Sequence, residues 1–207
     1  NDFSKFENYF VSILLSKRGS GVFPEDKDFK IDFLNINAYD LKNNKFIFES
    51  IENYKNNEKV DFNNLTIEHF MPQKLSPQWI VKLGDKHQEI HDKYLHTFGN
   101  LSLTGDNYQL GNKSFEEKKK ILTEKGKLKL NQFFIKSNNW TEKEILDRAN
   151  SLFEESKKIW FYPKNYALQI EVNNEEKEFY TLDDDLDLTG KKPSSFELFG
   201  ESVKTNS

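Results

Sequence analysis

Apolar residues spaced three and four positions apart predict helices in the first part of the chain. The N-terminal set keeps this spacing throughout: Phe3, Phe6, Tyr9, Phe10, Ile13 and Leu14. Such spacing puts apolar side chains on one face of an α-helix, and we expect this helix to end before the break at Gly19-Ser20-Gly21. After an irregular stretch around Pro24, a second set predicts another helix that runs into the polar segment 55–58: Phe46, Ile47, Ile51 and Tyr54.

Two short apolar runs farther along the chain predict a pair of strands. The first extends from Leu65 to Met71 around an acid-histidine pair, and the second extends from Leu101 to Thr104 after Gly99. Short apolar runs of this kind are typical of strands when turn-forming residues bound them. We therefore expect the order strand, loop, strand, with a helix to follow.

Asp106 is expected to cap the helix that follows the second strand. Gly111 could split this helix. The residues that it would carry are Phe115, Lys118, Ile121 and Leu122.

A later helix is predicted by a capping box, in which Thr141 and Glu144 satisfy each other's backbone donors at the helix start. Trp140 and Ile145 are placed to form the accompanying hydrophobic staple. Ala149, Leu152 and Phe153 would lie on one face of this helix, which should end near residues 160–163.

The remaining pattern predicts a module boundary near residue 164. Residues 167–172 and 178–182 flank Asn173-Asn174 and predict a β-hairpin, followed by an acidic end that contains Gly, Pro and Ser. We expect a mostly helical α+β domain over residues 1–163, which encloses a small strand-strand-helix core at about residues 64–122. Residues 164–207 are expected to be a β-containing tail, the start of a further module that is cut short.

The composition suits a globular intracellular protein. The chain has 207 residues, which is enough to bury a self-supporting core, and its 19 Phe, 8 Tyr and 3 Trp should dominate that core. It has no cysteine, which excludes disulfides and thiolate metal sites. No N-terminal apolar run followed by a small-residue cleavage site suggests export, and the apolar runs are far shorter than the roughly 20 residues that cross a bilayer. We expect a cytoplasmic protein without a membrane span.

The net charge of −4 appears unfavourable for binding nucleic acid, but the charge is unevenly distributed. Residues 164–207 hold ten acids and five lysines, so residues 1–163 have 25 basic residues against 24 acidic ones. Within that part, Gly111 to Leu130 contains seven lysines and three glutamates. A local basic strip therefore remains, although a solvated helix face explains such a run about as well.

The chemistry of the chain centres on Glu68-His69 at the end of the first predicted strand. Adjacent residues on a strand point to opposite faces, so a site that uses both must distort the strand or use the glutamate from the far side. The pair alone is weak support for a function. Asn100, Asn107 and Asn112 follow at spacings that strengthen it, together with Phe115 to Lys118.

These residues resemble the HNH branch of the His-metal finger nucleases, and more closely the nuclease domain of the GmrSD family of modification-dependent restriction enzymes. The matching segments begin near Phe46 and end near Trp160, well over half of the chain: Thr66-Ile67-Glu68-His69, Phe98-Gly99-Asn100-Leu101, Asn112-Lys113-Ser114-Phe115, Trp140 and Arg148-Ala149. The resemblance implies a DNA endonuclease domain of a restriction or antiviral defence system that acts on modified foreign DNA. It also implies that a nucleotide-hydrolysing domain precedes this one in full-length proteins, so the chain is expected to be a fragment.

The resemblance also implies a role for each residue of the motif. His69 would be the general base, and Asn100 would hold the strand hairpin so that His69 points at the attacking water. Glu68 and Asn107 would bind one Mg²⁺ or Mn²⁺ through hard oxygen donors. Asn112 is the alternative to Asn107, whose distance of seven residues from Asn100 is shorter than the nine usual in such sites. Lys118 and Lys113 would contact DNA phosphate.

His87, His91 and His96 form a second histidine cluster in the sequence, within and just after a helix expected over residues 86–94. The spacing of His87 and His91 by four residues could chelate zinc on one helix face. No third and fourth ligand is apparent, so we favour surface histidines. No glycine-rich phosphate loop is present, and nucleotide hydrolysis is not expected.

Three functions remain open on the sequence. The first is a metal-dependent endonuclease domain. The second is a DNA-binding or partner-docking domain that keeps the HNH scaffold without turnover, which the short Asn100 to Asn107 spacing and the small basic surface favour. The third is a structural helical domain in which the Glu-His pair is incidental.

Overall fold

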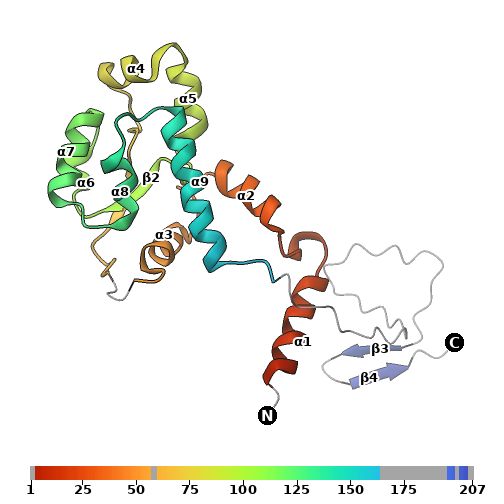
Figure 1. The fold of residues 1–207 in the computed structure, drawn as a ribbon. Helices are drawn as coiled ribbons and strands as arrows, with labels where there is room; N and C mark the ends of the chain where they lie inside the picture. The colour runs from red at the N-terminus through yellow and green to blue at the C-terminus, as the bar shows by residue number, and fades with distance from the viewer. Residues whose placement is uncertain (1–2, 57–59, 164–194, 199–200, 205–207) are drawn as a thin grey trace. The chain divides into compact units, whose positions relative to one another are not determined.

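The computed structural model describes residues 3–56, 60–163, 195–198 and 201–204. The chain divides into two units, residues 1–168 and 169–207, each of which is described by itself. The first unit is mostly helical with one small sheet, which confirms the expected α+β class (Figure 1). Its elements are α1 (Phe3–Ser16), α2 (Asp26–Asn35), α3 (Asn44–Asn53), β1 (Thr66–His69), α4 (Pro77–Leu83), α5 (His87–Tyr94), β2 (Leu101–Thr104), α6 (Asn107–Leu110), α7 (Phe115–Lys125), α8 (Lys129–Lys136) and α9 (Glu142–Ile159).

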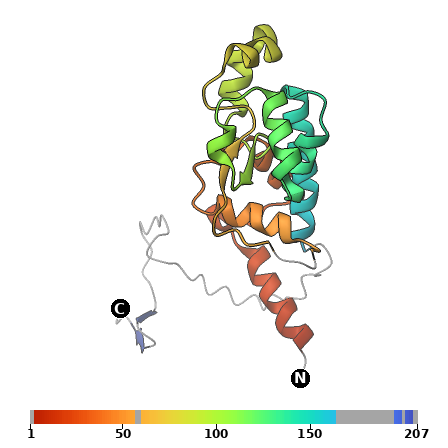
Figure 2. The same cartoon turned by 90° about the vertical axis from the view of Figure 1, so that its left-hand side faces the viewer.

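The two strands of this unit form an antiparallel hairpin whose connection carries α4 and α5. Thr66 pairs with Thr104, and His69 pairs with Leu101. The predicted order of strand, loop, strand and helix is confirmed. Figures 1 and 2 show helices around the hairpin, with α9 running past it, and every residue of β2 is buried.

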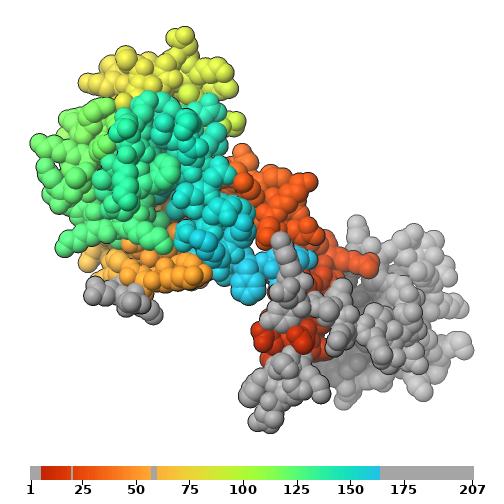
Figure 3. All heavy atoms as spheres, viewed as in Figure 1, coloured from red at the N-terminus to blue at the C-terminus, as the bar shows by residue number. Residues whose placement is uncertain are grey.

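Buried apolar side chains form two clusters. One is built from residues of α2, α3, β2 and α9 and includes Phe33, Phe48 and Phe98, of which Phe33 stacks on Phe98 with ring centroids 4.4 Å apart. The other gathers α4, α5, α7 and α8 around Phe70 and Trp140. Aromatic packing therefore dominates the core, as the composition indicated, and each such ring pair contributes about 0.5–1.5 kcal/mol beyond the area it buries. On the face drawn in Figure 3, the green, teal and cyan helices α7 to α9 form much of the surface.

The capping box predicted at the start of α9 is present, whereas the cap predicted at Asp106 is not. Thr141 and Glu144 form the box at the start of α9, and the staple residues Trp140 and Ile145 are fully buried. Gly111, with φ of 41°, ends the short helix α6. The Asp106 side chain does not cap α6. The residues from Phe115 onward belong to a separate helix, α7, which begins with its own capping box of Ser114 and Glu117.

Three helices, α2, α4 and α8, occupy stretches where no helix was predicted. The start of α8 depends on a residue far away in the sequence: Glu52 of α3 accepts hydrogen bonds from the backbone N–H groups of Lys129 and Leu130, each at 2.8 Å. Free N–H groups at a helix start favour an acceptor, and a negative charge there is stabilising. Glu52 itself is buried, so it joins α3 to α8 inside the unit.

In the second unit, β3 (Ser195–Leu198) pairs with β4 (Glu201–Lys204) in an antiparallel hairpin. The hairpin predicted over residues 167–182 lies outside the described residues. Among the described helices of the chain, none is both long and apolar enough to cross a membrane.

Candidate functional site

Glu68 and His69 lie at the end of β1 and point to opposite sides of it, as alternation along a strand requires. The Glu68 carboxylate faces Lys118 of α7. The His69 imidazole lies against Tyr39 and His96, with ring centroids 4.8 Å and 5.2 Å away. The strand end therefore separates an acidic side from an imidazole side.

On the acidic side, Glu68 forms a buried ion pair with Lys118. The Lys118 Nζ lies 2.5 Å from Oε1 of Glu68, and the exposed fractions of the two side chains are 0% and 5%. Nζ also donates to the backbone carbonyl of His69 at 2.6 Å. Burial raises the pKa of Glu68 and lowers the pKa of Lys118, and in each case the partner's charge opposes the shift.

The prediction that Lys118 contacts DNA phosphate does not fit this position. Its ammonium is buried and already holds Glu68 and the His69 carbonyl. The sequence contained a signal for this: Phe115, Lys118 and Leu122 share one helical face, and all three are buried. Lys118 belongs to the run of lysines at residues 118–120, but its spacing places it on the core face of α7.

Asn107 lies beside the acidic side of β1. Its Nδ2 donates to the Ile67 carbonyl at 2.9 Å and to the Thr66 hydroxyl at 3.2 Å. Thr66 and Glu68 share one face of the strand, so Asn107 and Glu68 are on the same face. The Ile67 and His69 carbonyls point the same way, and side chains of α6 and α7 satisfy them where a third strand would otherwise bind.

Oδ1 of Asn107 forms no hydrogen bond with any part of the chain that the structure describes. Asn112, the alternative ligand, is exposed in the loop between α6 and α7. An amide oxygen and a carboxylate on the same face of the strand are hard oxygen donors of the kind that suits Mg²⁺ or Mn²⁺. Asn107 therefore fits the predicted ligand role better than Asn112.

On the imidazole side, His69 is almost closed off from solvent, with 6% of its surface exposed. Its Nε2 lies 3.1 Å from Nδ1 of His96, and its Nδ1 lies 3.5 Å from the side-chain nitrogen of the exposed Gln73. Burial lowers the pKa of His69 to about 3, with smaller contributions from His96, Lys118 and His91. The imidazole is therefore neutral at physiological pH.

Asn100 is fully buried just beyond the strand ends, where all of its polar side-chain atoms are bound. Its Nδ2 donates to the carbonyls of Met71 and Leu95, each at 2.9 Å, and its Oδ1 accepts from the Met71 N–H at 2.7 Å and the Trp140 indole N–H at 3.2 Å. The Asn100 carbonyl also accepts from the N–H of Phe70 at 2.9 Å. These bonds fix the two residues that follow His69.

Arg148 of α9 binds backbone carbonyls of the same turn. Its Nη1 donates to the carbonyls of Phe98, Gly99 and Leu101 at 2.7–2.9 Å, and Nη2 donates to that of Leu130 at 3.2 Å. The guanidinium is buried without a carboxylate partner among the described residues, and burial lowers its pKa to about 9. A Cβ on Gly99 would overlap the backbone carbonyl of Ile145 on α9. The turn that carries Asn100 therefore packs closely against α9 and is held there by the hydrogen bonds of Arg148.

The three clustered histidines have different partners. His87 Nδ1 lies 3.0 Å from the Gly84 carbonyl, and His91 Nε2 lies 3.0 Å from the Pro72 carbonyl. His96 contacts His69 instead. The helix expected over residues 86–94 is present as α5. The contact between His96 and His69 was not predicted, because the two residues are 27 positions apart in the sequence.

The basic strip at residues 111–130 is smaller than its lysine count suggested. Lys118 is buried, and four of its other lysines have partners: Lys113 lies 3.9 Å from Glu117, Lys125 3.6 Å from Asp106, Lys129 3.6 Å from Glu155, and Lys119 donates to the Ser137 carbonyl at 2.6 Å. Lys113 is exposed, so its ammonium remains available to an anion. The net basic surface near the hairpin is therefore modest.

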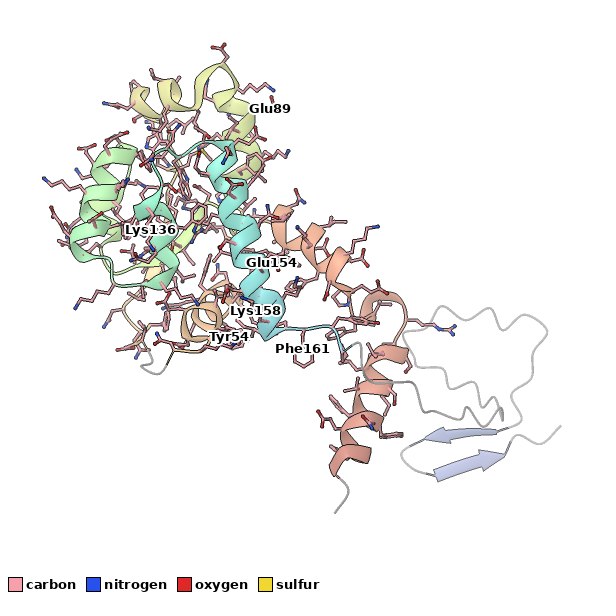
Figure 4. All side chains as sticks on the ribbon, viewed as in Figure 1. Tyr54, Glu89, Lys136, Glu154, Lys158 and Phe161 are labelled. Carbon is pink, nitrogen blue, oxygen red and sulfur yellow. The ribbon has the colours of Figure 1, made fainter. Side chains whose placement is uncertain are left out.

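A surface hollow of about 560 Å³ lies between the C-terminal ends of α3 and α9. Figure 4 shows Tyr54 and Lys158 next to each other there. Its lysines 158 and 129 lie 2.6 Å and 3.6 Å from Glu155, which offsets their charge. None of the predicted site residues lines this hollow.

The sequence matches one known family, described as GmrSD restriction endonucleases, C-terminal domain, over residues 23–155. The match runs from the segment before α2 into α9 and includes every residue of the site described above. Among curated proteins, none matches the chain.

Proposed function

The chain belongs to the GmrSD restriction endonuclease family, as its C-terminal domain, and on this premise we propose that it hydrolyses phosphodiester bonds in DNA with a histidine base and one divalent cation. Membership implies a nuclease domain with a DNA substrate. The observation that carries the finer proposal is the end of β1, where a neutral imidazole and a carboxylate lie on opposite sides of the same backbone, with Asn107 bound to the strand on the side of the carboxylate.

His69 is the general base of this proposal. Because burial keeps the ring neutral, a nitrogen lone pair is available at physiological pH to take a proton from water. Asn100 holds Phe70 and Met71, the residues directly after His69. It therefore acts as a positioning residue that fixes the direction of the imidazole.

Glu68 and Asn107 would hold one Mg²⁺ or Mn²⁺. The donor set fits, because Lys118 occupies only Oε1 of the carboxylate and Asn107 is oriented by its Nδ2 with Oδ1 left over. When bound, such a cation polarises the scissile phosphate and stabilises the leaving oxygen. Lys118 keeps the carboxylate in place on the strand, and Lys113 remains the candidate for a phosphate contact.

The proposal extends to the biological substrate and setting, which rest on the resemblance to modification-dependent restriction enzymes. The substrate would be modified foreign DNA in the cytoplasm. In the full-length protein, a nucleotide-hydrolysing domain would precede this domain. The tail after residue 164 has no assigned part in the reaction.

The experiment is a nicking assay on supercoiled plasmid, unmodified and base-modified, with Mg²⁺ or Mn²⁺ and with EDTA. The variant is His69→Ala, and the matched control is His87→Ala, since His87 contacts only the nearby Gly84 carbonyl among the described residues. We expect metal-dependent nicking that His69→Ala abolishes and His87→Ala retains. Equal nicking by wild type and His69→Ala would rule out the proposed base.

A second candidate function is a DNA-binding or docking domain without turnover. The observations that favour it are the engagement of Glu68 by Lys118 and the closure of His69 from solvent. This second function predicts that the same samples bind plasmid in a gel-shift assay and do not nick it with either cation.

A further inference from the structure

His96 contacts the proposed general base but has no part in the reaction as described so far. Its Nδ1 lies 3.1 Å from Nε2 of His69, within hydrogen-bond distance. The two rings meet edge to face, with an interplanar angle of 75°. The ring centroids are 5.2 Å apart, so the two nitrogens lie between the rings, as a hydrogen bond between them requires.

The position of His96 is fixed by residues between α2 and α3. The His96 carbonyl accepts a hydrogen bond from the N–H of Ala38 at 2.8 Å. Tyr39 stacks on the His96 ring at 5.3 Å with an interplanar angle of 23°, and it also packs against His69 at 4.8 Å. Residues 38–39 thus hold both imidazoles, although they lie about thirty residues before the first of them.

Only one hydrogen can lie between the two nitrogens, so two arrangements are possible. In one, His69 donates from Nε2 to His96, and Nδ1 of His69 keeps its lone pair. In the other, His96 donates, which occupies the Nε2 lone pair of His69 and leaves a hydrogen on Nδ1. A neutral His69 can take a proton from water only in the first arrangement.

We propose that His96 is a positioning residue that accepts a hydrogen bond from Nε2 of His69, and that Nδ1 of His69 takes the proton from the attacking water. This inference rests on the proposed function. The Nδ1 side of the ring faces Gln73, an exposed side chain, so it is the side nearer to solvent. When the proton moves from the water oxygen to Nδ1, the imidazolium continues to donate from Nε2 to His96. The tautomer of a base is commonly set by a partner of this kind.

The first test measures the tautomer directly and does not depend on activity. Long-range ¹H–¹⁵N correlation spectra of the 207-residue chain distinguish a histidine with hydrogen on Nε2 from one with hydrogen on Nδ1. The His69 signals are identified by their loss in His69→Ala. We expect the Nε2–H form in wild type and a mixture of both forms in His96→Ala. A single Nδ1–H form in wild type would overturn the proposal.

The second test uses four replacements of His96 in the nicking assay. Asn and Asp place an oxygen acceptor near the position of Nδ1, Gln places its amide near Nε2, and Ala offers no acceptor. We expect His96→Ala and His96→Gln to lower kcat about 10- to 100-fold with little change in KM, the range seen when partners of functional histidines are removed. His96→Asn and His96→Asp should restore most of the rate.

A fold control accompanies these variants, because His96 is half-buried. Tm should be similar for the Asn and Gln variants, so that a difference in kcat between them reports the acceptor position. Equal rates for Asn and Gln, or a wild-type rate for Ala, would refute the positioning role. If wild type fails to nick, the proposed function fails, while the tautomer spectra still decide whether His96 is the acceptor.

Discussion

Lys118 and Glu68 form a buried ion pair with an Nζ to Oε1 distance of 2.5 Å, which joins the first turn of α7 to β1. The pair lies directly beside the proposed base, since the same Nζ binds the His69 carbonyl. Moving two charges out of water is costly, and their attraction offsets this cost only while both are present. The pair is therefore a point at which single changes should have large effects.

We predict that Lys118→Met destabilises the domain by about 3–5 kcal/mol, because it leaves the Glu68 carboxylate buried without a counterion. Urea unfolding of the 207-residue chain measures the effect. The neighbouring Lys120 is exposed, so Lys120→Met is the matched control and should change the unfolding free energy by less than about 0.5 kcal/mol.

The double variant Glu68→Gln with Lys118→Met should recover most of this loss, to within about 2 kcal/mol of wild type, because no buried charge remains. Strictly additive destabilisation by the two single variants would contradict the coupling inferred from the geometry.

Asn100→Ala should destabilise the domain by at least about 3 kcal/mol, because it leaves buried donors and acceptors of Met71, Leu95 and Trp140 without partners. Trp140→Phe removes only one of these bonds but also leaves a cavity beside Phe70 and Phe134, so its cost combines the two effects. Chemical unfolding of both variants beside Asn112→Ala, which alters an exposed side chain, measures the difference. A small loss for Asn100→Ala would mean that the turn is held by other contacts.

Arg148→Lys should cost at least about 3 kcal/mol although it keeps the charge, since the single ammonium cannot span the four carbonyls that the guanidinium binds. Thermal unfolding followed by circular dichroism measures this. The control is Lys143→Arg at an exposed position of the same helix, and Tm should hardly move. A wild-type Tm for Arg148→Lys would show that the carbonyls find other donors.

The pH dependence of stability should carry a contribution from His69. Its pKa is lowered from 6.5 to about 3 by folding, so between these values the unfolded chain binds a proton that the folded chain does not. Stability is therefore unaffected above pH 6.5 and decreases as pH falls, by up to about 1.4 kcal/mol per pH unit from this group.

The measurement is urea unfolding at pH 7 and pH 5 in EDTA for wild type and His69→Gln. The loss of stability between the two pH values should be about 2 kcal/mol smaller in the variant. An equal loss in both proteins would indicate that the imidazole is solvated and titrates normally in the folded state.

Binding of Mn²⁺, followed by electron paramagnetic resonance, tests the ligand assignment separately from nicking. Glu68→Gln and Asn107→Ala should each weaken binding at least about tenfold, whereas Asn112→Ala should not. If Asn112→Ala weakened Mn²⁺ binding and Asn107→Ala did not, Asn112 would be the metal ligand in place of Asn107.

Sequence patterns located the elements whose signals are local. The apolar face of α1, the capping box of α9 and the two short strands are encoded by residues close together in the chain. By contrast, the helix start of α8 depends on Glu52, and α2 is held through Phe29 and Phe33 against Phe153. No local pattern contains such partners, so these helices could not be predicted in the same way.

The residues of the candidate site differ in the same way: some have a signal in the sequence, and others depend on distant partners. The motif residues 68, 69, 100 and 107 were singled out by their types, their spacing and the resemblance to the HNH nucleases, and the fold places Asn100 and Asn107 against the strand that carries the other two, while their roles stay predictions. The roles of Lys118 and His96 were not found, since each depends on a partner that only the folded chain brings near. For Lys118, its place on the apolar face of α7 was a usable signal; for His96, the sequence offered none.

The close approach of Gly99 to α9 has a consequence for mutational screens. If codon 99 were randomised and the library sorted only by how much folded protein accumulates, glycine should be recovered almost alone, because any side chain would meet the Ile145 carbonyl. Codon 113, for an exposed lysine, should tolerate nearly every amino acid in the same sort. An abundance screen of this domain would therefore outline its scaffold, and positions that vary freely in abundance but not in a nicking assay would mark the surface that meets DNA.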